Sequence, residues 1–254
     1  MNFVKRNIYY YVVPLIGRVF QCRNRFCNVI YYHDIVEGDG DSFMKINVEL
    51  FKRQMLYLKE KGIETLTFQD LESDPCLLSY SPRRVLITFD DGWRSNLTMI
   101  YDWMREQGLK YNIFLTVGEI GNNPAYLDWD QVRYMAQSGN VGFGVHTLTH
   151  PDLSFFDKID TEKEFSDANR LFEKELHYKP LDFCYPYGKY GDASDAFLRN
   201  YSYKRIFKSD LDYSRVRNGK IFFGRNAISA DEPFSVFIRK VKGYYNIFQS
   251  LKRK

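Results

Sequence analysis

Two adjacent carboxylates, Asp90 and Asp91, follow a short apolar segment and are the first residues of this chain whose types suggest chemistry. The segment at residues 84–89 is rich in β-branched and aromatic side chains and ends at Gly92, which is typical of a buried strand that runs into a turn. Ligands of parallel α/β folds bind at the carboxyl ends of strands. Because adjacent carboxylates repel each other unless a cation neutralises one of them, this strand end predicts a metal site, although the pair alone indicates only an α/β enzyme.

A pair of histidines at the end of a second apolar segment offers further metal ligands. His146 and His150 follow residues 141–145 and are four positions apart, a spacing at which two imidazoles can bind one ion. The chain has 4 histidines, so half of them occur at this predicted strand end. We therefore expect the pair to bind a metal together with a carboxylate of the first segment.

A third predicted strand end carries His33. It follows the aromatic segment at residues 29–32 and precedes Asp34. A lone histidine after aromatic residues is more often structural than catalytic. Its place at a strand end nevertheless makes it a candidate proton donor, which a metal-dependent hydrolase also needs.

Strands and helices alternate along the chain, which predicts an α/β fold on a parallel sheet that is closed or nearly closed. Beyond the three segments above, strands are expected at residues 65–68, 112–117, 182–188, 203–207 and 221–223. Helices are expected at residues 48–62, 97–107, 128–139, from 161 and from 233 onward. Two of them begin with capping patterns, namely Asp128 with Gln131 and Thr161 with Glu164.

The composition is that of one folded domain. With 44% hydrophobic and 27% charged residues the chain does not resemble a disordered protein. A net charge of +4 is weak evidence for nucleic-acid binding, and we expect no such partner. The 4 cysteines show no Cys-x-x-Cys spacing, so neither a zinc knuckle nor a disulfide framework is expected, and a reducing compartment is the simplest assumption.

Residues 1–28 form an aromatic and basic segment that precedes the main domain at residues 29–254. Lys5 and Arg6 stand before an apolar run, which is the charge order of a signal peptide, but no small-x-small cleavage site follows. A proline and an arginine interrupt the run and leave it too short for a transmembrane helix. Two placements are open: peripheral contact with a membrane through the N- and C-terminal segments, and a helix packed across the surface or the bottom of the barrel. We expect a cytoplasmic protein or one at the periphery of the inner membrane.

Three sets of residues together resemble motifs of the polysaccharide deacetylases of carbohydrate esterase family 4. They are Thr88-Phe89-Asp90-Asp91-Gly92, the block from Trp129 to His150, and Tyr185-Pro186-Tyr187-Gly188. Each set alone is unspecific, whereas their order and spacing are specific, and the resemblance covers residues 29–230. It implies a distorted, TIM-like (β/α) barrel with fewer than eight strands.

The resemblance also implies a role for each polar residue at the strand ends. A divalent metal, most simply zinc, would be bound by Asp91, His146 and His150. Asp90 would act as the base, with a second metal ligand as the alternative role. The backbone N–H of Tyr187, which follows Pro186, would help to hold the oxyanion. Three aromatic residues could line a sugar platform or simply close the barrel mouth: Tyr32, Trp93 and Tyr187.

Two departures from the family pattern bear on catalysis. The family usually has an arginine that orients the catalytic aspartate, and this chain has Cys184 at the corresponding place. Most members supply the acid from a late histidine, yet no histidine follows His177. A circularly rearranged branch, which includes the poly-N-acetylglucosamine deacetylases, carries this histidine first, and Tyr32-His33-Asp34 resembles that motif. His33 would then be the acid, while the orienting role has no assigned residue.

The function predicted in this way is metal-dependent removal of the N-acetyl group from an N-acetylhexosamine in a surface polysaccharide or in its lipid-linked precursor. The aromatic and basic ends weakly favour the lipid-linked precursor. The alternative is a catalytically silent barrel that binds a glycan or an assembly partner, with Cys184 as the first sign of a decayed site.

Overall fold

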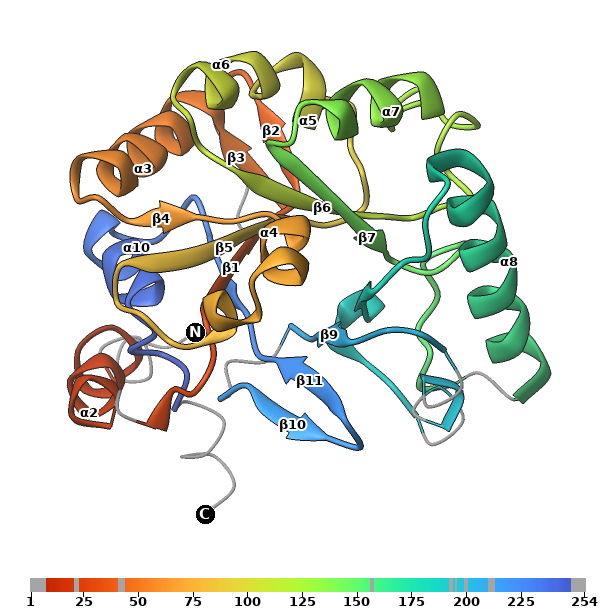
Figure 1. Ribbon diagram of the computed structural model, residues 1–254. Helices are drawn as coiled ribbons and strands as arrows, with labels where there is room; N and C mark the ends of the chain where they lie inside the picture. Colours follow the sequence, from red (N-terminus) through yellow and green to blue (C-terminus); the bar gives the residue numbers. More distant parts are fainter. Residues whose placement is uncertain are drawn as a thin grey trace.

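The computed structural model describes residues 8–20, 23–40, 44–155, 158–191, 194, 196–198, 201–209 and 213–247. In this part of the chain a curled sheet forms the centre of the molecule, and most helices lie along its outer side (Figure 1). The parallel strands, in spatial order, are β12 Asn226–Ala227, β1 Asn28–Tyr32, β5 Arg84–Phe89, β6 Tyr111–Leu115, β7 Val141–Val145, β8 Asp182–Cys184, β9 Arg205–Phe207 and β11 Lys220–Phe223.

Four short strands lie outside this parallel order. β10 (Arg215–Arg217) lies antiparallel to β11, and β4 (Glu64–Thr65) pairs with β5, while β2 (Asp34–Val36) and β3 (Lys45–Asn47) form a separate pair. No pairing joins β10 to β12 within the described residues, so the sheet is curled but open. The predicted α/β, TIM-like class is confirmed. The prediction of fewer than eight strands is wrong, because the sheet is 10-stranded. Several of its strands have only two to four residues, which is too short for a periodic pattern to show in the sequence.

The helices are α3 Val48–Glu60, α4 Phe68–Ser73, α5 Ser95–Thr98, α6 Tyr101–Glu106, α7 Trp129–Gln137, α8 Lys158–Leu176 and α10 Phe234–Val241. The capping box of Asp128 and Gln131 at the start of α7 is confirmed. Two local predictions are wrong. The strand expected at 65–68 stops at Thr65, because Thr67 caps α4 instead. Helix α8 already includes Lys158, so Thr161 and Glu164 do not form its cap.

Alternate residues of the parallel strands point to opposite sides of the sheet. One set of alternate strand residues packs together inside the barrel and includes Val29, Leu86, Phe114, Phe207 and Phe223. Their neighbours, for example Ile30, Ile87, Ile113, Ile206 and Phe222, belong to the larger core beneath the outer helices. The same alternation, continued for one or two residues past a strand, decides which polar side chains reach the interior of the barrel mouth.

The N-terminal segment packs against the C-terminal part of the chain. It consists of the π-helical turn η1 (Ile8–Val12) and helix α2 (Val13–Val19). Val13 shares a small cluster with Val236 and Tyr245. This packing is compatible with both placements left open above, because the opposite side of the segment is exposed. Among the described residues, no helix has both the length and the hydropathy to cross a membrane.

Candidate active site

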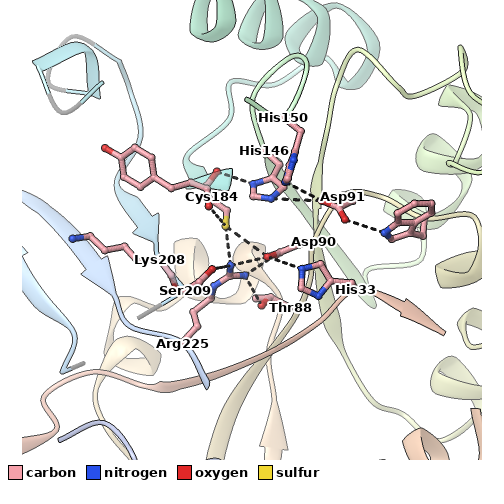
Figure 2. A network of polar contacts seen from close by, with 12 residues as sticks. His33, Thr88, Asp90, Asp91, His146, His150, Cys184, Lys208, Ser209 and Arg225 are labelled. Atoms are coloured by element: carbon pink, nitrogen blue, oxygen red, sulfur yellow. Dashed lines mark hydrogen bonds and ion pairs between the residues drawn. The ribbon is translucent and has the colours of Figure 1, made fainter. Parts of the chain in front are cut away.

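The polar residues of the strand ends meet in the mouth of the barrel (Figure 2). Asp90 follows β5 and His146 follows β7, and each continues the inward-facing positions of its strand. Cys184 ends β8 in the interior cluster, and Arg225 stands two residues beyond the interior Phe223 of β11. Since all four side chains are buried, this interior end holds a buried polar cluster that includes groups of opposite charge.

Several residues of the site have a left-handed backbone. Asp91 (φ 75), His150 (φ 61) and Tyr187 (φ 56) are among the non-glycine residues with positive φ. Such conformations are strained for an L-residue and persist where surrounding contacts fix them. At Asp91 one of these contacts is the hydrogen bond from the Thr116 N–H to its carbonyl, 3.0 Å. The chain therefore bends where its side chains must converge.

Arg225 holds the carboxylate of Asp90 through two parallel hydrogen bonds. Its Nη1 donates to Oδ1 at 2.6 Å and its Nη2 to Oδ2 at 2.7 Å. The guanidinium is itself fixed, because Nε donates to the Lys208 carbonyl at 3.0 Å and Cζ lies 4.3 Å from the centre of the Tyr31 ring. Burial opposes ionisation of Asp90, but the charge and hydrogen bonds of Arg225 outweigh it and hold the pKa of this carboxyl well below its usual range.

Asp91, His146 and His150 form a cluster of converging ligand atoms. Oδ1 of Asp91 lies 3.7 Å from Nε2 of His146 and 3.4 Å from Nε2 of His150. Two ligand atoms about 2.0–2.2 Å from one tetrahedral ion are themselves roughly 3.3–3.6 Å apart. Among the described residues this buried Oδ1 has no hydrogen-bond partner, whereas Oδ2 accepts a hydrogen bond from Trp93 Nε1 at 3.0 Å. The donor set and the unsatisfied oxygen both fit a divalent metal such as zinc.

Both histidines are prepared to act as neutral ligands. Nδ1 of His146 donates to the carbonyl of Cys184 at 2.8 Å, which leaves the lone pair on Nε2 facing Asp91. Burial lowers the pKa of His146 to about 3 and also lowers the pKa of His150. Burial, together with the charge of Asp90, raises the pKa of Asp91 to about 6 when no cation is bound. A bound cation would favour the charged carboxylate, so metal and Asp91 stabilise each other.

A second group of ligand atoms, those of Asp90, His146 and Cys184, is also close enough to share an ion. Three observations argue against it. Both oxygens of Asp90 are occupied by Arg225, Nδ1 of His146 is occupied by a carbonyl, and the positive guanidinium lies 2.9 Å from the Cys184 sulfur. Burial keeps the pKa of the Cys184 thiol well above its usual value, so no thiolate is available. The better candidate site for a cation is therefore the cluster of Asp91, His146 and His150.

The profile of the family described as polysaccharide deacetylase matches residues 79–206, half of the chain. The chain belongs to this family. It is 29% identical over 170 residues to YxkH of Bacillus subtilis (strain 168), a protein whose name carries the same family, covering 65% of this chain and 58% of that protein. It is 33% identical over 88 residues to a chitooligosaccharide deacetylase of Rhizobium leguminosarum bv. trifolii, covering 34% of this chain and 38% of that protein. The chain thus spans less than two thirds of the length of these curated relatives.

Solved structures of deacetylases share the fold. The structure of Streptococcus pyogenes deacetylase PplD in complex with acetate superimposes with a TM-score of 0.71 at 20% identity, covering 89% of this chain and 98% of that one. IcaB from Ammonifex degensii superimposes with a TM-score of 0.68 at 22% identity, covering 87% and 97%. At these identities the likeness concerns the fold.

Arg225 takes the place beside Asp90 that Cys184 cannot fill. The arginine expected on the strand of Cys184 has a counterpart two residues beyond β11, and its Nη2 lies 2.9 Å from the Cys184 sulfur. A small side chain at position 184 leaves room for this guanidinium. Sequence reasoning missed Arg225, although one signal was present: it stands at the end of the apolar segment 221–223, at an inward position.

The structure brings most of the predicted residues together. His33 is buried with Nε2 4.0 Å from Asp90 Oδ2, Trp93 orients Asp91, and the Tyr187 ring packs 4.7 Å from that of His150. In the turn at Pro186–Gly188 the two backbone hydrogen bonds are donated by Gly188 and Lys189, so neither involves the N–H of Tyr187.

Tyr32 does not belong to the mouth of the barrel. Its ring is fully buried, stacks on Phe89 and donates a hydrogen bond to Gln54 at 2.8 Å. The prediction that it lines a sugar platform is therefore wrong. The reason is the alternation along β1: Tyr31 and His33 point inward, so Tyr32 between them points to the outer core. Trp93 remains near the mouth and stacks on Tyr126 at 4.6 Å.

Glu164 of α8 holds the loop that carries the two histidines. Its Oε2 accepts hydrogen bonds from the N–H groups of Leu148 and Thr149 at 3.0 and 2.9 Å, and its Oε1 accepts one from the Thr149 hydroxyl at 2.6 Å. This is the role that the structure gives to Glu164 in place of the predicted helix cap. The carboxylate thereby fixes the backbone between His146 and His150.

We expect Glu164→Ala to weaken zinc binding by about tenfold, in the range found when groups that support metal ligands are removed. The loop would lose three hydrogen bonds, and His150 would lose its fixed position beside Asp91. Competition with a chromogenic chelator measures the change. Glu162→Ala on the exposed side of the same helix is the matched control, and equal zinc affinities for both variants would contradict the role of Glu164.

Proposed function

We propose that the domain is a metal-dependent hydrolase that removes the N-acetyl group from an N-acetylhexosamine, in a surface polysaccharide or in its lipid-linked precursor. The observation that supports this best is the pairing of a three-ligand cluster with a separate carboxylate that Arg225 keeps ionised beside it. Names of relatives point the same way, since they include a chitooligosaccharide deacetylase and a chitin deacetylase.

The site offers the groups that amide hydrolysis requires. A divalent cation, when bound by Asp91, His146 and His150, supplies Lewis acidity toward a carbonyl oxygen and toward water. Asp90 accepts the proton of the attacking water, a type of help that contributes about 10²–10⁴-fold. A carboxylate of such low pKa is a weak base, so it accepts a proton readily only from water more acidic than bulk water. The electrostatics of Asp90 therefore suit a site built around a Lewis acid.

Two further groups serve the departing amine and the developing negative charge. His33, buried 4.0 Å from Asp90, donates a proton to the leaving nitrogen as the tetrahedral intermediate collapses. The N–H of Tyr187 holds the oxyanion of that intermediate. The exposed ring of Tyr187 and the stacked pair of Trp93 and Tyr126 give the mouth aromatic surfaces suited to sugar rings.

The test is acetate release from N-acetylglucosamine oligomers by the purified protein loaded with zinc. We expect acetate and free amine in equal amounts, with O-acetylated sugars as the comparison substrates. His33→Ala is expected to lower kcat by at least about 10²-fold, the lower end of the range for proton-transfer help. Unchanged turnover in His33→Ala would remove the acid assignment. A metal-loaded protein that binds the oligomers but releases no acetate would support the catalytically silent barrel.

A further inference from the structure

The N-terminal segment has an apolar face that no other described residue covers. We define the outer face as the exposed side chains of η1 and α2 and the residue that follows: Ile8, Tyr11, Val12, Leu15, Val19 and Phe20. Tyr11, Leu15 and Val19 are 64%, 65% and 69% exposed. The residues recur every three or four positions, so they form one stripe. The opposite stripe, with Val13 and Gly17, is buried against the C-terminal segment.

This segment is thus apolar on both sides, which packing against the domain does not require. Contiguous exposed apolar surface of this kind marks an interaction site. The charge of the surrounding chain indicates the partner. Residues 1–33 contain no acidic residue and five basic ones, and residues 233–254 contain no acidic residue and six basic ones. In the remainder of the chain acidic residues outnumber basic ones.

The described parts of these two ends, residues 8–20 and 23–33 and residues 233–247, lie side by side in the fold. The Tyr9 and Tyr245 rings are 4.9 Å apart, Arg239 donates to the Tyr10 carbonyl at 2.6 Å, and Asn246 donates to Asn24 at 2.9 Å. Figure 1 shows α2 at one edge of the molecule, beside the segment that follows α10. Exposed Arg18 and Arg23 flank the outer face, and Arg23 lies 4.7 Å above the Phe20 ring.

We propose that the outer face docks the protein on an anionic lipid bilayer. Apolar and aromatic side chains of an interfacial helix enter the boundary of the acyl chains while neighbouring basic residues meet the headgroups. Each basic residue near an anionic surface strengthens binding by about fivefold, the equivalent of ~1 kcal/mol. A second copy of the chain is a poorer partner for this face, because contact between two such faces would oppose clusters of like charge.

Docking in this way leaves the metal cluster uncovered. Asn28, the first residue of β1, donates to the carbonyl of Val241 at 2.9 Å, so the C-terminal segment on which α2 packs lies near the amino end of the strand. His33 follows the other end of β1. Asn28 and His33, at the two ends of β1, are about 16 Å apart, at a rise of ~3.3 Å per residue.

Sedimentation with lipid vesicles tests the proposal. The full chain is expected to pellet with vesicles of phosphatidylcholine and phosphatidylglycerol, less so at high salt, and weakly with phosphatidylcholine alone. Leu15→Glu with Val19→Glu should lower the partition coefficient by at least about a hundredfold, since burial of two such side chains is lost. The matched control is Leu56→Glu with Tyr134→Glu, two exposed apolar positions on α3 and α7, which should bind as the unchanged protein does.

Three results would overturn it: no pelleting of the unchanged chain, equal pelleting of the outer-face variant, or a dimer in solution that the variant dissociates. A second measurement covers the case in which two glutamates disturb folding. The Leu15→Trp variant keeps an apolar side chain, and its fluorescence should shift to the blue on anionic vesicles and be quenched by brominated lipid. A spectrum unaffected by both would also refute docking through this face.

Discussion

Replacing Arg225 with lysine is expected to lower kcat for acetate release by about 10²-fold, within the range assigned to general-base help. The guanidinium binds both oxygens of Asp90, whereas an ammonium group acts as a point charge and holds one. Asp90 would remain ionised but lose its fixed orientation toward the attacking water. The three proposed metal ligands make no hydrogen bond to Arg225, so zinc content measured by mass spectrometry should not change.

A double-mutant cycle separates orientation of Asp90 from a general structural effect. If Arg225 acts through Asp90, adding Arg225→Lys to Asp90→Asn should cause little further loss of kcat. The matched control is Arg205→Lys. Arg205 is also buried and binds Asp182 through two hydrogen bonds of 2.5 and 2.7 Å, but Asp182 begins β8, at the end of that strand opposite to the site. It should lower the melting temperature without lowering kcat, and a similar loss of kcat in both variants would contradict the assignment.

The sequence was sufficient for residues whose role depends on their own strand. Asp90, Asp91, His146 and His150 each follow an apolar segment, and parallel strands bring such ends together. The sequence was insufficient for Arg225. Its partner Asp90 is 135 positions away, and their contact depends on how β12 joins the sheet beside β1 rather than on any local pattern.

Local patterns also misled in two places for a physical reason. Tyr32 is adjacent to His33, but adjacency along a strand places two side chains on opposite faces. Glu164 three residues after Thr161 has the spacing of a capping box, yet its carboxylate serves a distant loop because α8 begins earlier. In both cases the local pattern singled out a residue with a structural role, but tertiary packing decided which neighbour that residue contacts.

Replacing Asp91 with alanine is expected to remove both zinc and activity, while Cys184→Ser keeps zinc. Oδ1 of Asp91 is the atom toward which both imidazoles point, at 3.7 and 3.4 Å, and no other buried carboxylate oxygen near them is unsatisfied among the described residues. Without it two neutral histidines remain, and they hold a dication weakly. Zinc should therefore raise the melting temperature of the unchanged protein and of Cys184→Ser, but not of Asp91→Ala.

The size of this shift follows from mass action. A ligand present at a thousand times its dissociation constant stabilises the native state by about 4 kcal/mol. In a domain of this length each 1 kcal/mol corresponds to about 2–4 °C in melting temperature. The reverse result, in which Cys184→Ser loses the shift and Asp91→Ala keeps it, would assign the ion to Asp90, His146 and Cys184. Asp90 would then be a ligand rather than the base, and the proposed hydrolysis would have no group to accept the proton of water.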